Sequence, residues 1–410
     1  MRRVFSRPWF LLVLLPGVLL VLIALATHKP TAQWQGDLDI YARYANEIVH
    51  GKLPYRDVKV EYPPLALLPM LLPRIVTLGY ALPIKYINGL FLLGNALWAT
   101  ILAGAMWRVA RQVGRRPWVA MLVLAGLVGT LAPMLGWRFD LFPAMLTALA
   151  LVSALAGRDG WAGGWLGLGI AAKLYPVVLG PVFAARALAR LRWRKLLALA
   201  LGAGLAVALA VGPFLLVGRA GLLSFLLYHE NRGVQIESLA GGLVLLGVLA
   251  GQTTATVVFT YGSLNLESPW ATALLPWAMP LFVVLYGGLV AALVVREVNE
   301  ARMLRDDPSA WASRLIQASA AALLVFIVAN KVYSPQYLAW LLPFVLLLRP
   351  GQIALFGAIC IATIIFFPFF YQSLLDFVPW TIWLLNARNL ATVALLVWVV
   401  LAPPRLQLRA

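Results

Sequence analysis

The longest polar interval of the chain, residues 36–64 (GDLDIYARYANEIVHGKLPYRDVKVEYPP), is the first place where side chains of the right type for chemistry gather. It contains five of the fifteen acidic residues of the protein, namely Asp37, Asp39, Glu47, Asp57 and Glu61. Carboxylates concentrated beside a hydrophobic segment either solvate a loop or act on a substrate there. We favour chemistry, and the solvated loop is the alternative.

Charged residues from distant segments are expected on the same side of the membrane as these carboxylates. The predicted topology collects the following residues at the outer ends of the spans: Asp37, Asp39, Glu61, Arg138, Asp140, Lys173, His229, Glu230, Arg232, Glu237 and Lys331. A charge at membrane depth is costly, so each is a candidate for function. A carboxylate cluster with several cations suits a substrate that has an anionic leaving group and a nucleophile that needs a base.

The composition of the chain is that of a membrane protein. Of the 410 residues, 62% are hydrophobic and 12% are charged, whereas soluble domains are about 45–50% apolar. The net charge of +18 would suggest nucleic acid for a soluble protein, but here the basic residues fall between apolar spans and set their orientation. Cys360 is the single cysteine, which excludes an intrachain disulfide and a cysteine metal cluster.

Basic clusters predict which side of the membrane each loop faces. They lie before the first apolar run, where Arg2, Arg3 and Arg7 occur, and at residues 108–116 and 186–195. Lys and Arg favour cytoplasmic loops, so these clusters share one side if the chain starts in the cytoplasm. The acid-rich loop then faces outward, toward the periplasm.

We predict an all-α polytopic protein, with about 12 transmembrane helices in one integral membrane domain over residues 1–410. The first apolar run, residues 9–27, is long enough to span a bilayer and is interpreted as a retained anchor, with a signal peptide as the alternative. The other spans are expected near residues 84–107, 117–135, 139–156, 161–172, 175–189, 196–217, 270–295, 315–329, 336–348, 353–370 and 387–402.

Two outer regions separate these spans. The first, residues 28–80, is expected to contain an amphipathic helix that Gly51 ends, an ordered loop, and a second juxtamembrane helix over residues 65–79. The second, residues 218–269, is expected to contain a partly embedded helix over residues 240–261.

Six motifs occur in a fixed order along nearly the whole chain. They are DLDIY, GKLPY, EYPP, AAKLYP around Lys173, RGVQIES at residues 232–238, and NKVYSPQY at residues 330–337. With these motifs the chain resembles the GT-C superfamily mannosyltransferases that use polyprenyl-phosphate mannose. Within them it resembles glycosyltransferase family 87 and is similar to the phosphatidylinositol mannoside mannosyltransferases.

The resemblance implies a membrane enzyme that moves a sugar, mannose in these relatives, from a polyprenyl-phosphate donor to a lipid or glycan acceptor with inversion. It implies a site at the periplasmic face of the bacterial cytoplasmic membrane, with no cofactor and no nucleic-acid partner. The acid of the family's first outer loop matches Asp37, which would take the proton of the acceptor hydroxyl. Phosphate is a good leaving group, so no general acid is required. The site does need cations where the departing oxygens gather charge, and we choose Lys173, Arg232 and Lys331.

Further polar residues of the motifs are candidate substrate-binding residues: Asp39, Glu61, Tyr62, His229, Glu237, Tyr333 and Gln336. Glu61 could instead pair with Arg56 or Lys59. For His229 the alternative is a place at the membrane interface, and for Arg232 a structural ion pair. For Tyr333, Gln336 and Tyr337 the alternative is the aromatic belt.

The candidate base and the candidate phosphate ligand in AAKLYP also have structural alternatives. Asp37 precedes Leu38 and could cap the amphipathic helix. On that helix Asp37 and Asp39 would lie about 200° apart, so we predict no metal, with a divalent cation as the alternative. Lys173 could snorkel to headgroups, but the broken span beside Pro176 is tolerated only if it is buried or lines a cavity.

A transporter or flippase of lipid-linked sugars is the competing function. Transporters are built from internal repeats and carry ionisable residues near the bilayer midplane. This sequence has no clear repeat and its polar residues gather at one face, which favours surface chemistry. A structural scaffold would leave the gathered charges without a role. The glycines Gly163, Gly167 and Gly202 are interpreted as sites of close helix packing.

Overall fold

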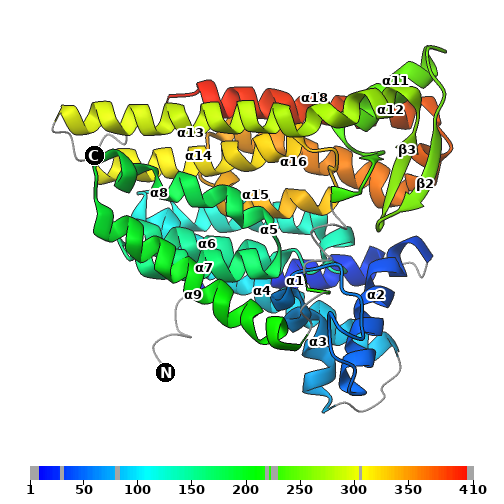
Figure 1. Cartoon of the computed structure of the whole chain (residues 1–410), viewed down its shortest axis with the longest axis horizontal. Coiled ribbons are helices and arrows are strands. Elements are labelled where there is room, and N and C mark those ends of the chain that lie inside the picture. Colours follow the sequence, from blue (N-terminus) through cyan, green and yellow to red (C-terminus); the bar gives the residue numbers. More distant parts are fainter. Residues whose placement is uncertain are drawn as a thin grey trace. The chain divides into compact units, whose positions relative to one another are not determined.

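The computed structural model of the chain consists mainly of helices (Figure 1). It describes residues 9–27, 32–78, 84–217, 221–222, 230–303 and 307–403. His229 and the first basic cluster, Arg2, Arg3 and Arg7, lie outside these ranges. The predicted all-α polytopic class is confirmed, with one small sheet in addition.

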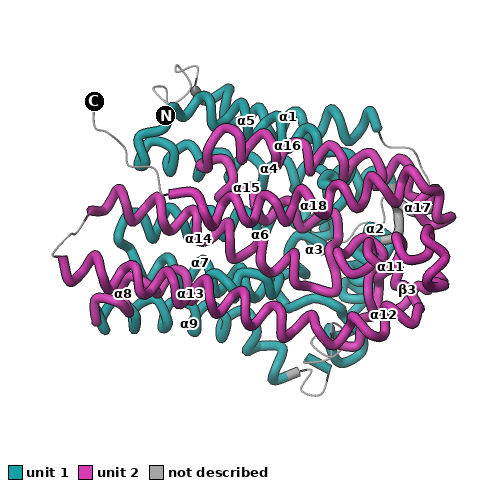
Figure 2. Tube along the Cα trace, turned by 90° about the horizontal axis from the view of Figure 1, so that it is seen from above, with its two compact units in different colours: residues 1–180, 192–226 teal, residues 181–191, 227–410 magenta. Residues whose placement is uncertain are grey.

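The chain forms two compact units (Figure 2). Unit 1 comprises residues 1–180 and 192–226, and unit 2 comprises residues 181–191 and 227–410. The short segment 181–191 therefore belongs to unit 2, although the sequence on both sides of it belongs to unit 1.

Unit 1 is built from helices. They are α1 (Trp9–Thr27), α2 (Ala32–Val49), α3 (Leu67–Val76), α4 (Ile84–Gln112), α5 (Pro117–Leu135), α6 (Leu141–Leu155), α7 (Asp159–Ala172) and α9 (Trp193–Val217), with 3-10 turns η1 (Pro64–Ala66) and η2 (Tyr175–Leu179). Helix α1 has the bounds predicted for the anchor and packs on α4 and α5. A Cβ added at Gly17 would lie 2.7 Å from the Ala96 carbonyl oxygen, so small residues permit this packing.

The tightest helix pair in unit 1 is α7 with α9. A Cβ added at Gly163 would collide with the carbonyl oxygen of Leu199, and one at Gly167 with that of Ala203. From the other side, a Cβ at Gly202 would collide with the backbone of Gly160. The predicted close packing at these glycines is confirmed, and it fixes the helix that ends just before Lys173.

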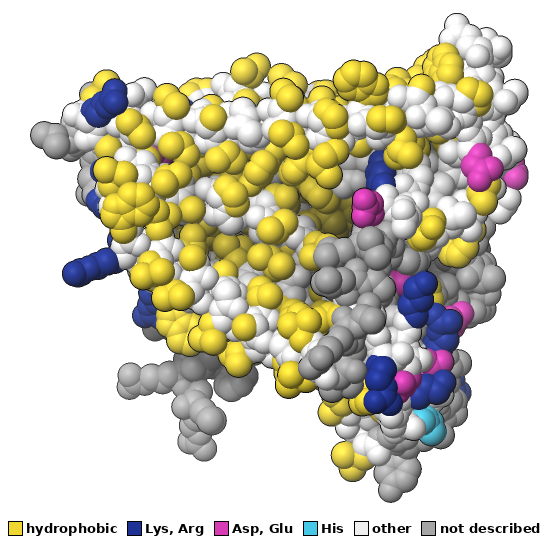
Figure 3. Space-filling view, in the orientation of Figure 1, with side chains coloured by type: hydrophobic (Ala, Val, Ile, Leu, Met, Phe, Trp, Pro, Cys, Tyr) yellow, Lys and Arg dark blue, Asp and Glu magenta, His cyan; other side chains and the backbone are white. Residues whose placement is uncertain are grey.

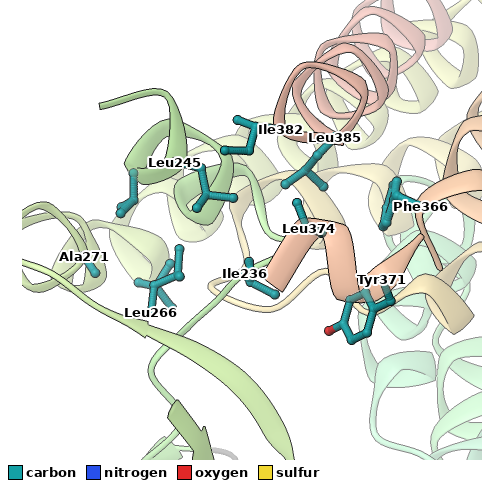
Figure 4. Packing of buried hydrophobic residues seen from close by; sticks show 11 residues of the cluster. Ile236, Leu245, Leu266, Ala271, Phe366, Tyr371, Leu374, Ile382 and Leu385 are labelled. Atoms are coloured by element: carbon teal, nitrogen blue, oxygen red, sulfur yellow. The ribbon is translucent and has the colours of Figure 1, made fainter. Parts of the chain in front are cut away.

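Unit 2 holds the remaining elements. They are α8 (Gly180–Ala189), β1 (Val234–Gln235), α11 (Leu239–Leu249), β2 (Thr256–Thr260), β3 (Ser263–Glu267), α12 (Pro269–Leu274), η3 (Leu275–Trp277), α13 (Ala278–Arg302), α14 (Pro308–Ala329), η4 (Pro335–Tyr337), α15 (Leu338–Val345), α16 (Pro350–Ile364), η5 (Ile365–Phe369), α17 (Tyr371–Leu375) and α18 (Pro379–Leu401). Ile236, Leu245, Leu266, Leu374 and Leu385 belong to one buried cluster that joins the sheet to α11, α17 and α18 (Figure 4).

The helix predicted over residues 240–261 is wrong in its second half. Helix α11 ends at Leu249, and Gly251 follows with a φ of +67°. Strands β2 and β3 then form an antiparallel hairpin, and β3 also pairs with β1. The turn residues Tyr261 and Gly262 both have positive φ, which is typical of the two-residue turn whose twist matches that of the strands.

Eight helices in the described ranges are long and apolar enough to cross a membrane. The spans predicted at residues 139–156 and 175–189 correspond to shorter apolar helices, Leu141–Leu155 and Tyr175–Ala189. Hydrophobic side chains cover much of the face shown in Figure 3. On α9 the exposed residues Leu197, Leu201, Leu205 and Leu209 recur every fourth position, as expected of a helix that faces lipid. The chain is a multi-pass membrane protein.

Candidate active site

Asp37 lies inside helix α2, one turn after its start at Ala32. The alternative that Asp37 only caps this helix is therefore wrong. Its carboxylate forms an ion pair with Arg138 and accepts a hydrogen bond of 3.4 Å from the Tyr41 hydroxyl, one turn further along α2. Burial is the main cause that raises the pKa of Tyr41 well above its ordinary value, so Tyr41 stays a neutral donor.

The short turn Arg138-Phe139-Asp140, between α5 and α6, joins two ion pairs. Arg138 pairs with Asp37, whereas Asp140 pairs with Lys173 at an Nζ to Oδ1 distance of 2.7 Å. The Asp140 side chain is 1% exposed and the Asp37 side chain is 24% exposed. The carboxylate of the first pair is therefore accessible to solvent, whereas the carboxylate of the second pair is buried.

Aromatic rings surround the turn. The ring centre of Phe139 lies 5.7 Å from that of Tyr41 and 5.1 Å from that of Tyr62, and 4.8 Å from the Lys173 ammonium nitrogen. Apolar surroundings exclude water and strengthen electrostatic interactions between the charges they enclose. Tyr62 thus lies within the predicted site.

Lys173 lies where a membrane helix is interrupted. Helix α7 ends at Ala172, Lys173 takes an extended conformation, and η2 begins at Tyr175. The Lys173 side chain contacts Asp140 and Phe139 inside the protein. The snorkelling alternative for Lys173 is therefore wrong.

Asn95 fixes the backbone that presents Arg138. It is 1% exposed on helix α4, and its Nδ2 donates to the carbonyl oxygens of Leu135 at 3.3 Å, Gly136 at 3.0 Å and Arg138 at 3.0 Å. One buried amide thus holds the end of α5 and the start of the turn.

The loop from Lys52 to Tyr62 is ordered, as predicted. The Tyr55 hydroxyl donates to the Tyr62 carbonyl oxygen at 2.7 Å. Arg56 pairs with Asp57 at 2.9 Å, so the predicted alternative that Glu61 pairs with Arg56 is wrong. Burial, and then the nearby Glu61 carboxylate, raises the pKa of Tyr44 to about 12.

Unit 2 contains its own group of predicted site residues. Lys331 Nζ donates to the Glu230 carbonyl oxygen at 2.5 Å, and Arg232 Nε donates to the Tyr261 carbonyl oxygen at 2.8 Å. Burial, and then the Arg232 charge, lowers the pKa of Lys331. Two of the three predicted phosphate ligands are thus close neighbours.

Glu237 and Tyr333 are buried in unit 2 around a residue that sequence reasoning missed, Arg388. Glu237 accepts a hydrogen bond of 2.7 Å from Tyr371, and its carbonyl oxygen accepts one of 3.0 Å from Arg388. The Arg388 guanidinium lies 3.8 Å from the Tyr333 ring centre. Arg388 could have been recognised from the sequence, because it is a single cation inside an apolar run.

The remaining candidates have less specific surroundings. Gln336 is half-buried in η4, and Asp39 is exposed on α2. Tyr333 and Tyr337 are buried, so the aromatic-belt alternative is wrong for both. Within the described ranges, no three His, Cys, Asp or Glu side chains are grouped as metal ligands.

Comparison with known proteins indicates a family. The sequence model described as glycosyltransferase family 87 matches residues 61–328. Among solved structures, the crystal structure of ArnT from Cupriavidus metallidurans in the apo state is similar, with a TM-score of 0.39 and 18% sequence identity over 93% of this chain and 76% of that chain. No curated protein matches.

Proposed function

The chain belongs to glycosyltransferase family 87, and from this premise we propose that it transfers mannose from a polyprenyl-phosphate donor to a lipid or glycan acceptor. It is a membrane glycosyltransferase, so the transporter alternative is not needed. The sugar, the donor and the acceptor are the parts that we propose.

The observation that carries the proposal is the joint arrangement of Asp37, Arg138, Asp140 and Lys173 around one turn of unit 1. The turn brings a solvent-accessible carboxylate, that of Asp37, close to two cations, Arg138 and Lys173. An inverting transfer from a phosphate donor needs those two functions, a base for the hydroxyl and positive charge for the leaving group.

In the proposed reaction, Asp37 accepts the proton of the acceptor hydroxyl while that oxygen forms a bond to the anomeric carbon. The bond between the anomeric carbon and the phosphate oxygen breaks, and its electron pair stays on the phosphate. Lys173 stabilises the charge that collects on the phosphate oxygens. Arg232 and Lys331 are proposed as further phosphate ligands.

The other site residues divide by exposure. Asp39, Glu61 and Tyr62, on α2 and the following loop, are proposed to contact the acceptor or the sugar. So are Gln336, which is half-buried, and His229. Glu237 and Tyr333 are buried with protein partners, and we propose that they act by holding their segments in place.

The direct test is a panel of short-chain polyprenyl-phosphate sugars, carrying mannose, glucose or arabinose, incubated with the purified protein and membrane lipid acceptors. We expect a new glycolipid, detected by mass, with mannose and with inverted anomeric configuration. No product from any donor would overturn the proposed function, and product from another sugar alone would overturn mannose.

We also propose that the site faces the periplasm of a bacterial cytoplasmic membrane. Asp57 lies in the exposed part of the first outer loop, and the single cysteine, Cys360, is buried. Asp57→Cys therefore adds one accessible thiol. A membrane-impermeant maleimide should label it on intact cells, and labelling only after lysis would reverse the orientation.

A further inference from the structure

The carboxylate that the proposed mechanism uses as a base is occupied in this structure. Oδ2 of Asp37 pairs with Arg138 and also accepts from the Tyr41 hydroxyl. A cation and a hydrogen-bond donor at a carboxylate favour its charged form and lower its affinity for a proton. In this state Oδ2 of Asp37 is engaged by two protein partners, which makes the carboxylate a weaker base.

We propose that Arg138 is a ligand of the donor phosphate, and that its movement from Asp37 to the phosphate releases Asp37 to act as the base. This inference rests on the proposed function. Guanidinium binds phosphate and carboxylate with the same paired N–H donors, so the phosphate competes directly for Arg138. Donor binding and activation of the base then become one event.

The two ion pairs of the turn differ in what their separation would leave behind. If Lys173 left Asp140, a carboxylate that is 1% exposed would lose an ion-pair partner without gaining contact with solvent, which is strongly unfavourable. If Arg138 left Asp37, the carboxylate would keep solvent access and the Tyr41 hydrogen bond. The Asp37–Arg138 pair is therefore the one that an incoming phosphate opens.

The groups around Asp37 determine what happens after Arg138 leaves. Tyr41, the hydrogen-bond partner of Asp37, interacts with Tyr62, Asp140 and Glu61. Asp39 lies two residues after Asp37 on α2, and the Lys173 ammonium lies 6.0 Å from the Tyr62 ring centre. The charge of Lys173 is balanced by Asp140. Loss of Arg138 thus leaves Asp37 near acidic and neutral groups, which increases its affinity for a proton.

The Asn95 clamp is consistent with movement of the side chain alone. Its three hydrogen bonds fix the backbone of the turn, including the Arg138 carbonyl oxygen. The guanidinium lies at the end of a long side chain that is 16% exposed. It can change partner by rotation about side-chain bonds while the turn keeps its place.

The test is the pH dependence of transfer at saturating acceptor, with the donor concentration varied. The profile of kcat/KM for the donor reports the donor-free enzyme, and that of kcat reports the donor complex. In the wild type we expect the acid limb of kcat at a higher pH than that of kcat/KM, by about one unit, because a neighbouring opposite charge shifts titration by one to three units.

Arg138→Gln should make the two acid limbs coincide and should weaken binding of sugar-free polyprenyl phosphate, measured by calorimetry, by about tenfold or more, as expected for loss of a charged hydrogen-bond pair. Arg138→Lys keeps a cation and should keep part of the separation. Arg56→Gln is the matched control, since it removes an arginine paired with Asp57 in the same unit.

Two results would overturn the inference while the proposed function stands. One is coincident acid limbs in an active wild-type enzyme, a result that needs no variant. The other is a folded Arg138→Gln enzyme that binds polyprenyl phosphate as the wild type does. A wild-type protein that neither binds this lipid nor transfers sugar would instead overturn the proposed function and, with it, this inference.

Discussion

The Lys173 ammonium nitrogen lies 2.7 Å from Oδ1 of Asp140, a residue at the start of a different helix. Asp140 is buried and Lys173 is largely buried. The pair therefore has a structural part, which stabilises the fold, and a proposed functional part, which is the positive charge offered to a donor phosphate. The two parts can be separated by mutation.

Lys173→Met should impair both parts. Removing one partner of a buried ion pair costs about 3–5 kcal/mol, so the thermal unfolding temperature should fall. Loss of a charge aimed at the leaving group should lower kcat by roughly 10²-fold or more.

Lys173→Met combined with Asp140→Asn should recover most of the lost unfolding temperature, because both charges of the ion pair are removed together. It should not recover transfer. Recovery of transfer together with stability would show that Lys173 acts only through the ion pair, and would remove it from the proposed phosphate ligands.

Asp37→Asn tests the base. The amide keeps the size of the side chain and an oxygen that can accept from Tyr41, but it cannot take a proton. We expect a folded protein that binds polyprenyl phosphate and loses transfer by about 10²–10⁴-fold. Glu47→Gln is the control, since Glu47 is another acid of α2 and pairs with Lys52 at 3.8 Å. Near-normal turnover of Asp37→Asn would exclude Asp37 as the base.

Much of the helical framework could be predicted from sequence because long apolar runs have few alternatives in a membrane. The bounds of α1 and α5 are those expected, since polar or basic residues flank both runs. The hairpin around Gly262 could not be predicted in the same way. Its first strand, β2, is a short and largely apolar run (TVVFT), which periodicity alone does not distinguish from a buried helix.

The partners within the site were the other part that sequence could not supply. Arg138 and Asp140 were recognised as outer charges, but neither was assigned a partner, because both contacts join residues far apart in the chain. Likewise, Arg56 pairs with its neighbour Asp57 in the structure. Sequence spacing alone did not favour this pairing over one with Glu61.

The tyrosines of the first outer loop should make stability fall at alkaline pH. The pKa of Tyr44 is raised to about 12, chiefly by burial. Its unfolded value is about 10, so the unfolded chain loses the proton first and the stabilisation is lost between about pH 10 and pH 12. Above pH 10 the unfolding temperature of Tyr44→Phe, measured by thermal unfolding in detergent, should fall less steeply with pH than that of the wild type. Equal slopes would contradict the assignment.

The α7 and α9 interface should be intolerant of a single added methyl group. A Cβ at Gly163 on α7 would collide with the Leu199 carbonyl oxygen on α9. A Cβ at Gly204, on α9 itself, would meet nothing within 4 Å. Gly163→Ala should therefore lower stability by about 1–3 kcal/mol through overpacking. Gly204→Ala should be neutral or slightly stabilising, because alanine favours a helix by roughly 0.5–1 kcal/mol over glycine.

The same substitution should affect the site, because α7 ends at Ala172 and Lys173 follows directly. A displaced α7 would move the Lys173 ammonium relative to Asp140, so we expect Gly163→Ala to raise the donor KM more than the acceptor KM. The measurement compares thermal unfolding and both KM values for the two alanine variants. If Gly163→Ala lowers the unfolding temperature but leaves the donor KM unchanged, the packing of α7 does not position Lys173 for the donor.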